Sequence, residues 1–177
     1  MNDDDTKLVK ECLGGVTRAY EQIIDKYQKP IFNVAYRMIC NREDAEDITQ
    51  AVFVKAFEKL VTYNPRYKFF SWLYRMAINE SLNFIDQKKH LQDFDEKLVS
   101  LEKTPEELYD ESEIQQNIQE ALMSLKLEYR IVVVLRHYQD LSYHEIAQIL
   151  DVPEKTVKSR LFSARQLLRD ILLKKAV

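Results

Sequence analysis

The chain has 177 residues, a formal net charge of −3 and a hydrophobic content of 46%. A protein that coats DNA on its own is normally strongly basic, so this balance excludes that class. Only two glycines and four prolines are present, and no sustained alternation of polar and apolar residues is visible. The composition therefore predicts an all-α fold with long helices and few tight loops.

No segment indicates a membrane span, a metal site or an enzyme. The longest apolar run, residues 131–135, is far shorter than a bilayer requires. The acidic start MNDDDTK does not resemble a signal peptide, so we expect a cytoplasmic protein. Cys12 and Cys40 are solitary, and we expect them to be thiols of a reducing compartment. Without a glycine-rich phosphate loop or a metal-ligand cluster, we expect no cofactor and no catalysis.

The N-terminal part predicts three helices. A short one around Leu8 to Cys12 ends at Gly14-Gly15, and a long one, Ala19 to Cys40, contains Pro30, where we expect a kink. Asn41 is a favourable N-cap for the third helix, whose first turns are acidic. That helix is interpreted either as a solvated surface helix or as a docking face for a basic partner. The docking residues would be Asp44, Glu46, Asp47 and Gln50.

The next stretch, residues 61–70, is a loop dense in aromatic and basic residues, a combination suited to unpaired bases. A helix follows, with Ser71 as its expected N-cap, and Arg75, Asn79 and Asn83 form a polar stripe along it. An asparagine amide both donates and accepts, so it can pair with a base edge. Trp72 is ambiguous between the DNA edge and the core. The candidate single-strand contacts are Tyr63, Arg66, Tyr67, Lys68, Phe70, Arg75, Asn79 and Asn83.

Charge is segregated along the chain. Between Gln92 and Glu113 there are nine acidic residues and two lysines, with Pro105 among them. This pattern is typical of an acidic linker. We therefore expect two small helical domains, residues 1–90 and 114–177, joined by a linker over 91–113.

The C-terminal part predicts a helix-turn-helix. Residues 114–125 have helical spacing, and the apolar run 129–138 is interpreted as a buried helix rather than a strand, because no partner strand is found. Ser142 and Glu145 have the spacing of a capping box, and Pro153 fits the first position of a second helix. From Pro153 to Val177 seven residues are basic and two are acidic.

The second helix of this pair has an apolar stripe, which we expect to be buried, and a basic and polar face away from it. Phe162 lies off that stripe, among basic and small polar residues, as a helix in a DNA major groove requires. The alternative is a solvated amphipathic helix of a bundle. The expected base readers are Lys158, Ser159, Phe162 and Ser163, and the expected phosphate contacts are Lys155, Thr156, Arg160, Arg165 and Arg169.

Four blocks of the sequence, in this order, resemble bacterial sigma factors of the group-four, extracytoplasmic-function (ECF) class. They are the long helix from residue 19, the block DAEDITQ at 44–50, the block FSWLYRMAIN at 70–79, and the helix-turn-helix at 141–165. The resemblance implies an N-terminal domain that docks on the β′ clamp helices of core RNA polymerase and melts the downstream (minus-ten) element. It implies a C-terminal domain that reads the upstream (minus-thirty-five) element and rests on the β-flap. The linker would thread toward the RNA exit path, and an anti-sigma factor is a further possible partner.

Two residues depart from the pattern of many members of this class. Lys155 replaces a glycine, and Ser163 replaces an arginine that could contact guanine in a bidentate manner. Another hypothesis, a free-standing helix-turn-helix repressor or activator with an N-terminal sensor or dimerisation domain, gives no role to the aromatic loop. An enzyme is the third hypothesis, and it lacks a supporting motif.

Overall fold

The structure is a computed structural model, and it describes residues 3–94 and 113–175 of the chain. These residues form helices without a strand, which confirms the predicted all-α class. The N-terminal group comprises α1 (Asp3–Leu13), α2 (Thr17–Ile39), α3 (Arg42–Glu58), a short 3₁₀ turn (Leu60–Thr62) and α4 (Phe69–Phe94). The predicted acidic linker falls largely on residues 95–112, which lie outside the described residues.

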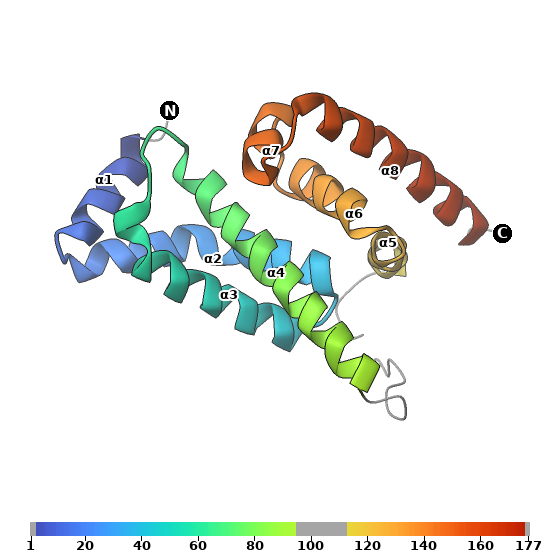
Figure 1. The fold of residues 1–177 in the computed structure, drawn as a ribbon, viewed down its shortest axis with the longest axis horizontal. Coiled ribbons are helices and arrows are strands. Elements are labelled where there is room, and N and C mark those ends of the chain that lie inside the picture. Colours follow the sequence, from blue (N-terminus) through green and yellow to red (C-terminus); the bar gives the residue numbers. More distant parts are fainter. Residues whose placement is uncertain (1–2, 95–112, 176–177) are drawn as a thin grey trace.

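The C-terminal group comprises α5 (Glu113–Met123), α6 (Leu127–Val133), α7 (Tyr143–Leu150) and α8 (Glu154–Lys175). A π-helical turn, Val134–Tyr138, continues α6. The apolar run that could have been a strand is therefore helical, as predicted. Figure 1 shows α6 lying between α4 and α8, with α7 at the end of α4 nearest the aromatic loop.

Local sequence signals explain the ends of these helices. Asn41 is the N-cap of α3, since its side chain accepts a hydrogen bond from the amide of Asp44 at 2.9 Å. Gly15 has a φ of +83°, which glycine tolerates, and the chain turns there between α1 and α2. Pro30 lies inside α2, which continues through it to Ile39.

The predicted N-cap of α4 is wrong. The helix begins at Phe69, two residues before Ser71, and the hydroxyl of Ser71 is buried without a hydrogen-bond partner. The reason is tertiary packing: Phe69 is 1% exposed and is drawn into the core, where its ring lies edge-on to Tyr27. Burial of this ring starts the helix three residues earlier than the serine signal indicates, because an N-cap at Ser71 would make Trp72 the first helical residue.

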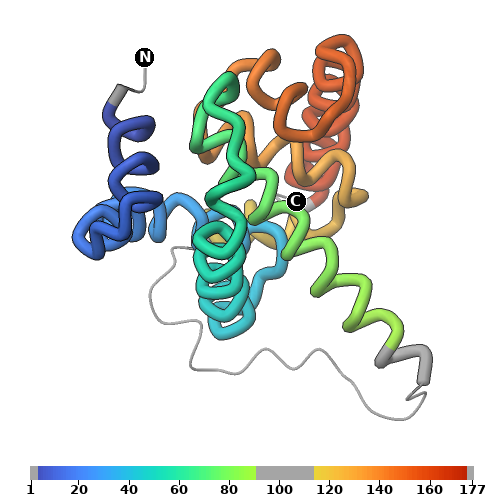
Figure 2. The backbone as a smooth tube through the Cα atoms, turned by 60° about the vertical axis from the view of Figure 1, so that its left-hand side comes forward, coloured from blue at the N-terminus to red at the C-terminus, as the bar shows by residue number. Residues whose placement is uncertain are grey.

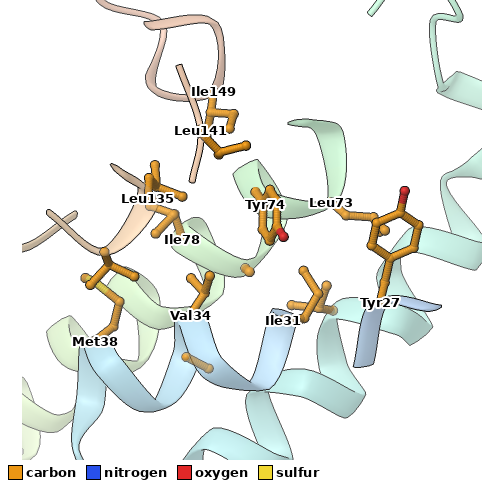
Figure 3. Close-up of a cluster of buried hydrophobic side chains, with 14 of the residues drawn as sticks. Tyr27, Ile31, Val34, Met38, Leu73, Tyr74, Ile78, Leu135, Leu141 and Ile149 are labelled. Atoms are coloured by element: carbon orange, nitrogen blue, oxygen red, sulfur yellow. The ribbon is translucent and has the colours of Figure 1, made fainter. Parts of the chain in front are cut away.

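The hydrophobic core is continuous across the two groups of helices. Ile31, Val34 and Met38 of α2, together with Tyr74 and Ile78 of α4, face the C-terminal group. The side chains that meet them belong to residues Leu135, Leu141 and Ile149 (Figure 3). The tube in Figure 2 shows the C-terminal group, from yellow to red, packed alongside the N-terminal one. The two helical groups are thus joined through buried apolar surface, and this joint positions the functional residues described below.

Candidate DNA and polymerase interfaces

The helix-turn-helix is formed by α7, a three-residue turn and α8. The capping box of α7 is present: Glu145 accepts from the backbone amide of Ser142 at 2.9 Å, and the hydroxyl of Ser142 accepts from the amide of Glu145 at 3.2 Å. Asp151 ends α7 in the left-handed conformation, with a φ of 55°. Pro153 accepts the first backbone bonds of α8, so it caps that helix rather than beginning it.

The two faces of α8 differ as the sequence predicts. Val157, Leu161 and Ala164 are at most 1% exposed and pack on the C-terminal core. Phe162, on another face, is 67% exposed. A single exposed apolar side chain is common on protein surfaces, but here the ring lies among basic and small polar residues. The helix therefore presents an aromatic ring on a surface that the protein leaves uncovered.

The basic and polar residues of α8 differ in the contacts that they make in the structure. Lys158 pairs with Glu154 at 2.9 Å on the surface. Arg160 pairs with Glu128 of α6 at 3.2 Å, so a phosphate contact would require that ion pair to break. The other predicted upstream residues divide into an exposed set, Lys155, Ser159, Arg165 and Arg169, and a half-buried set, Thr156 and Ser163.

The predicted polymerase-docking residues lie on α3. Asp47 and Gln50 are exposed, and Val54, one turn further along the same side, is 57% exposed. In contrast, Asp44 pairs with Lys88 at 3.6 Å and Glu46 with Arg42 at 3.0 Å. The side of α3 with Asp47, Gln50 and Val54 therefore combines a carboxylate, an amide and an apolar group in contact with solvent.

The aromatic loop is partly a structural unit and partly exposed. Tyr63 donates a hydrogen bond from its hydroxyl to the carbonyl of Tyr67 at 2.6 Å, and its ring packs edge-on to Phe69 at 5.3 Å. Trp72 is half-buried against Tyr63 and Phe69, at 5.5 and 5.7 Å between ring centroids. Tyr67 is 56% exposed. Of these rings, Tyr67 is the one best placed to stack on a base.

Arg66 is exposed and Phe70 is half-buried against Tyr74, while Asn79 and Asn83 are exposed along α4. Asparagine is unfavourable in the middle of a helix, and both of these side chains are in contact with solvent. The sequence correctly predicted a polar stripe here.

The remaining two candidates, Lys68 and Arg75, contact the C-terminal group. Lys68 pairs with Glu145 at 2.6 Å. Arg75 donates to the carbonyls of Ile149 at 2.8 Å and Gln148 at 3.2 Å. A cavity of about 770 Å³ lies beside these contacts, between the aromatic loop and the turn after α7.

Sequence reasoning missed the residues that join the two groups. The guanidinium of Arg130 is buried and donates to the carbonyl of Met38 at 2.7 Å and to three carbonyls at the end of α5. Burial lowers the pKa of Arg130, and these carbonyls compensate its charge. The signal available in the sequence was a single arginine beginning an otherwise apolar run, IVVVL. Gln139 is the second missed residue, since it accepts from the hydroxyl of Tyr74 at 2.7 Å.

Within residues 3–94 and 113–175, no group of three or more His, Cys, Asp or Glu side chains is arranged to hold a metal ion. None of the helices in those ranges has the length and apolarity needed to traverse a bilayer.

Comparison with known families defines the class of this fold and these surfaces. The sequence profile of Sigma-70 region 2 matches residues 23–91, and that of Sigma-70 region 4 matches residues 115–168. The first covers the side of α3 that was predicted to dock, the aromatic loop and the polar stripe of α4. The second covers the helix-turn-helix. The protein is therefore a sigma factor of the Sigma-70 family.

Relatives that match most of the chain identify the subgroup of the Sigma-70 family to which the protein belongs. The chain is 33% identical to the ECF RNA polymerase sigma factor SigW of Bacillus subtilis, over 92% of the chain and 94% of the relative. It is 30% identical to the ECF RNA polymerase sigma-E factor of Escherichia coli, over 92% and 91%. The chain belongs to the ECF sigma factors. It is an alternative initiation factor, without catalysis of its own, that binds core RNA polymerase and directs it to specific promoters.

Two solved structures share the fold. One is the sigma factor RpoE in complex with the anti-sigma factor NepR from Bartonella quintana, with a TM-score of 0.75 and 23% identity over 88% of this chain and 98% of that one. The other is CnrH in complex with the cytosolic domain of CnrY, with a TM-score of 0.75 and 24% identity over 96% and 97%.

Proposed function

We propose that the chain divides promoter recognition between its two helical domains at the level of named residues. The domain over residues 1–90 binds core polymerase and opens the downstream element, and the domain over 114–177 reads the upstream element. The observation that carries this proposal is the exposed face of α8, where Phe162 is 67% exposed opposite side chains that are at most 1% exposed. A face of this kind suits duplex DNA, which is read through base edges in the major groove.

On α8, Lys158, Ser159, Phe162 and Ser163 face the upstream bases, and Phe162 meets a thymine methyl group. Five residues hold phosphates on either side: Lys155, Thr156, Arg160, Arg165 and Arg169. For Arg160 this means exchanging Glu128, now 3.2 Å away, for the DNA backbone. The exchange is feasible because surface ion pairs contribute about 1 kcal/mol or less.

On α3, the exposed side with Asp47, Gln50 and Val54 docks on the basic clamp helices of the β′ subunit. Val54 supplies apolar contact and Asp47 supplies charge, a combination typical of interfaces. Asp44 and Glu46, which hold Lys88 and Arg42 respectively, belong to the edge of this surface.

The docking surface can be tested by competition for core polymerase. Asp47→Arg and Gln50→Ala should both weaken core binding, with an unchanged circular dichroism spectrum. Asp25→Arg makes the same charge change at an exposed position of α2 and should have no effect. Equal affinity of wild type and both α3 variants would show that this side of α3 is only solvated.

The aromatic loop and α4 capture unpaired bases of the non-template strand. Tyr67 stacks on a base, Asn79 reads the edge of a base that has left the helix, and Arg66, Lys68, Arg75 and Asn83 hold the strand. Tyr63 and Phe70 form the sides of this site. Stacking contributes about 1–3 kcal/mol per base without demanding a particular sequence.

Run-off transcription with core polymerase, followed by mapping of start sites, tests the proposed function as a whole. The protein should direct initiation at a defined set of promoters, and Asn79→Ala should lose duplex promoters while keeping templates with a pre-opened bubble. We place the protein in the cytoplasm, where RNA polymerase acts. The complex of RpoE with the anti-sigma factor NepR, in which RpoE shares this fold, supports an anti-sigma factor as a further candidate partner.

A further inference from the structure

A second cavity, of about 620 Å³, lies where the C-terminal half of α4 meets the junction between α5 and α6. Its volume is typical of ligand pockets, which occupy about 300–1,000 Å³. None of the residues that line it belongs to the surfaces proposed above for DNA or polymerase. Both helical groups contribute to its apolar lining, which includes Phe84, Ile85, Met123, Leu125 and Leu127. Four of these five side chains are only half-buried, so apolar surface remains in contact with solvent.

The rim of this cavity is basic. It carries three exposed lysines, Lys88, Lys89 and Lys126. Lys88 pairs with Asp44 at 3.6 Å, and its ammonium group lies 5.6 Å from the ring centroid of Phe84. In the described parts of the chain, residues 3–94 and 113–175, no carboxylate pairs with Lys89 or Lys126. An apolar interior beneath unpaired ammonium groups suits a peptide segment that has an apolar centre and acidic flanks.

The segment that connects the two walls of the cavity has this chemistry. Residues 95–112, which lie outside the described residues, join the end of α4 to the start of α5. The sequence EELYDE, at 106–111, places Leu108 and Tyr109 between two pairs of acidic residues. The other apolar stretch, LVSL at 98–101, lies between Lys97 and Lys103. Charge complementarity with the lysine rim therefore favours EELYDE as the occupant.

The length of the chain allows EELYDE to reach the cavity. Tyr109 precedes Glu113, the first residue of α5, by four positions, and four extended residues span about 14 Å. The cavity lies at the other end of α5, beside Met123, and a helix of eleven residues is about 16 Å long. The side chain of Tyr109 bridges the remaining gap. Because the segment is covalently attached, it also meets the cavity at a high effective concentration.

We propose that residues 106–111 bind in this cavity in the free chain. Leu108 and Tyr109 pack on its apolar lining, and the acidic pairs face Lys89 and Lys126. Met123 is a favourable neighbour for the tyrosine, since a thioether gains from contact with an aromatic ring. The inference goes beyond the proposed function and does not depend on it. A partner protein that used the same cavity would have to displace this segment.

Methyl NMR of the full-length chain, labelled with ¹³C at methionine, tests the proposal. The chain has four methionines; Met38 and Met123 line the cavity, and Met76, further back on α4, does not. Tyr109→Leu keeps an apolar side chain but removes the magnetic effect of the ring. The Met123 resonance should therefore shift in this variant, and the Met76 resonance should stay in place. Dilution of the wild-type chain should leave the Met123 resonance unchanged, because the segment belongs to the same molecule.

Reversing the charge of the rim should release the segment. In a chain with Lys89→Glu and Lys126→Glu, adding Tyr109→Leu should cause no further shift of Met123, since the ring has already left the cavity. Lys10→Glu with Lys29→Glu is the matched control, because both lysines are exposed and lie outside the cavity. In that background Tyr109→Leu should shift Met123 as it does in wild type. Circular dichroism checks that each variant is folded.

A fluorescent peptide of residues 104–112 provides the second measurement. It should bind the chain in which residues 106–111 are replaced by alternating glycine and serine, and should bind wild type about tenfold more weakly, because the native segment competes. If Tyr109→Leu moves neither Met38 nor Met123, or if the peptide fails to bind the replaced chain or binds both chains equally, the proposal is wrong. If the Met123 shift is lost on dilution, a second copy of the chain supplies the segment, which also contradicts the proposal.

Discussion

The two surfaces proposed to bind DNA in this sigma factor differ in the contacts that they make within the free chain. On α8, Phe162 faces solvent, and its basic neighbours pair within their own domain. On α4 and the preceding loop, Arg75 and Lys68 are bonded to α7 of the other domain. The proposed surface for duplex DNA therefore makes contacts only within its own helical group, and two cations of the proposed surface for single-stranded DNA contact the other group.

The difference corresponds to the order of events at a promoter. Duplex DNA exists before initiation, so a preformed surface can read it at once. Unpaired bases exist only after polymerase has opened the helix, and an exposed stacking surface before that moment would bind any single strand. In the free chain Tyr67 remains 56% exposed, while the two cations beside it, Lys68 and Arg75, contact α7.

The largest expected effect comes from removing the hydrogen bonds by which Arg130 joins the two helical groups. Arg130→Met keeps an unbranched apolar stem but removes the guanidinium that donates to the carbonyls of Met38, Leu122, Met123 and Leu125, of which Leu122 still accepts from the amide of Leu125. We expect the free energy of unfolding of the full-length chain to fall by about 3 kcal/mol. Chemical denaturation monitored by circular dichroism measures it.

The matched control for that variant is on the uncovered surface. Arg160→Met removes a half-exposed arginine with one ion pair, to Glu128, and should cost below about 1 kcal/mol. If Arg130→Met and Arg160→Met lower the free energy of unfolding equally, the buried hydrogen bonds of Arg130 contribute no more to stability than a surface ion pair.

Truncating the exposed ring of α8 tests the uncovered surface. Phe162→Ala in holoenzyme should reduce preference at particular upstream positions by about 1–3 kcal/mol, because a base-edge contact is lost while phosphate contacts remain. Binding to a panel of single-base upstream variants measures it. Leu173→Ala, at a position of α8 that is 56% exposed and three turns further on, should leave the pattern intact. A uniform loss across all sequences would contradict the assignment of Phe162 as a base reader.

Truncating the exposed ring of the loop tests the covered surface. Tyr67→Ala should weaken promoter opening by about 1–2 kcal/mol, since one base loses its stacking partner, and should leave core binding unchanged. Permanganate reactivity of downstream thymines reports opening, and a pre-opened template should rescue the variant. Gln87→Ala, an exposed change further along α4, is the control. Failure of the pre-opened template to rescue would place the defect elsewhere.

The smallest effect concerns acidification. Because the pKa of Glu145 is depressed to about 2 from its usual 4.5, the stability it gives is complete above 4.5 and is lost as pH falls toward 2. Part of that stability belongs to the pair with Lys68, and so to the contact between the two helical groups. We expect it to be below about 1 kcal/mol, because Lys68 is half-exposed. The free energy of unfolding of wild type should therefore fall below pH 4.5, and that of Glu145→Gln should depend less on pH.

The sequence predicted correctly those features that depend on residues close together in the chain. The capping box at Ser142, the N-cap at Asn41 and the exposure of Phe162 follow from spacing along one helix, and all three are confirmed. The start of α4 was wrong because burial of Phe69, a tertiary contact, outweighed the serine signal.

The inter-domain contacts lay beyond local reasoning altogether. The donor Arg75 and the carbonyls it meets at Gln148 and Ile149 are more than seventy positions apart in the chain. Every residue has a backbone carbonyl, so the sequence does not indicate which carbonyls accept these hydrogen bonds. The packing of α7 on α4 is therefore seen only in the structure.

A photo-crosslinking residue at position 67 tests the central claim most directly. Tyr67 lines the cavity beside α7 and is 56% exposed, so there is room for the larger side chain of benzoyl-phenylalanine. In the free chain it should crosslink to the α7–α8 turn around Gln148 and Asp151. In the open promoter complex it should crosslink to the non-template strand instead. A probe that stays linked to the turn in the open complex, or that never reaches the turn in the free chain, would contradict the account.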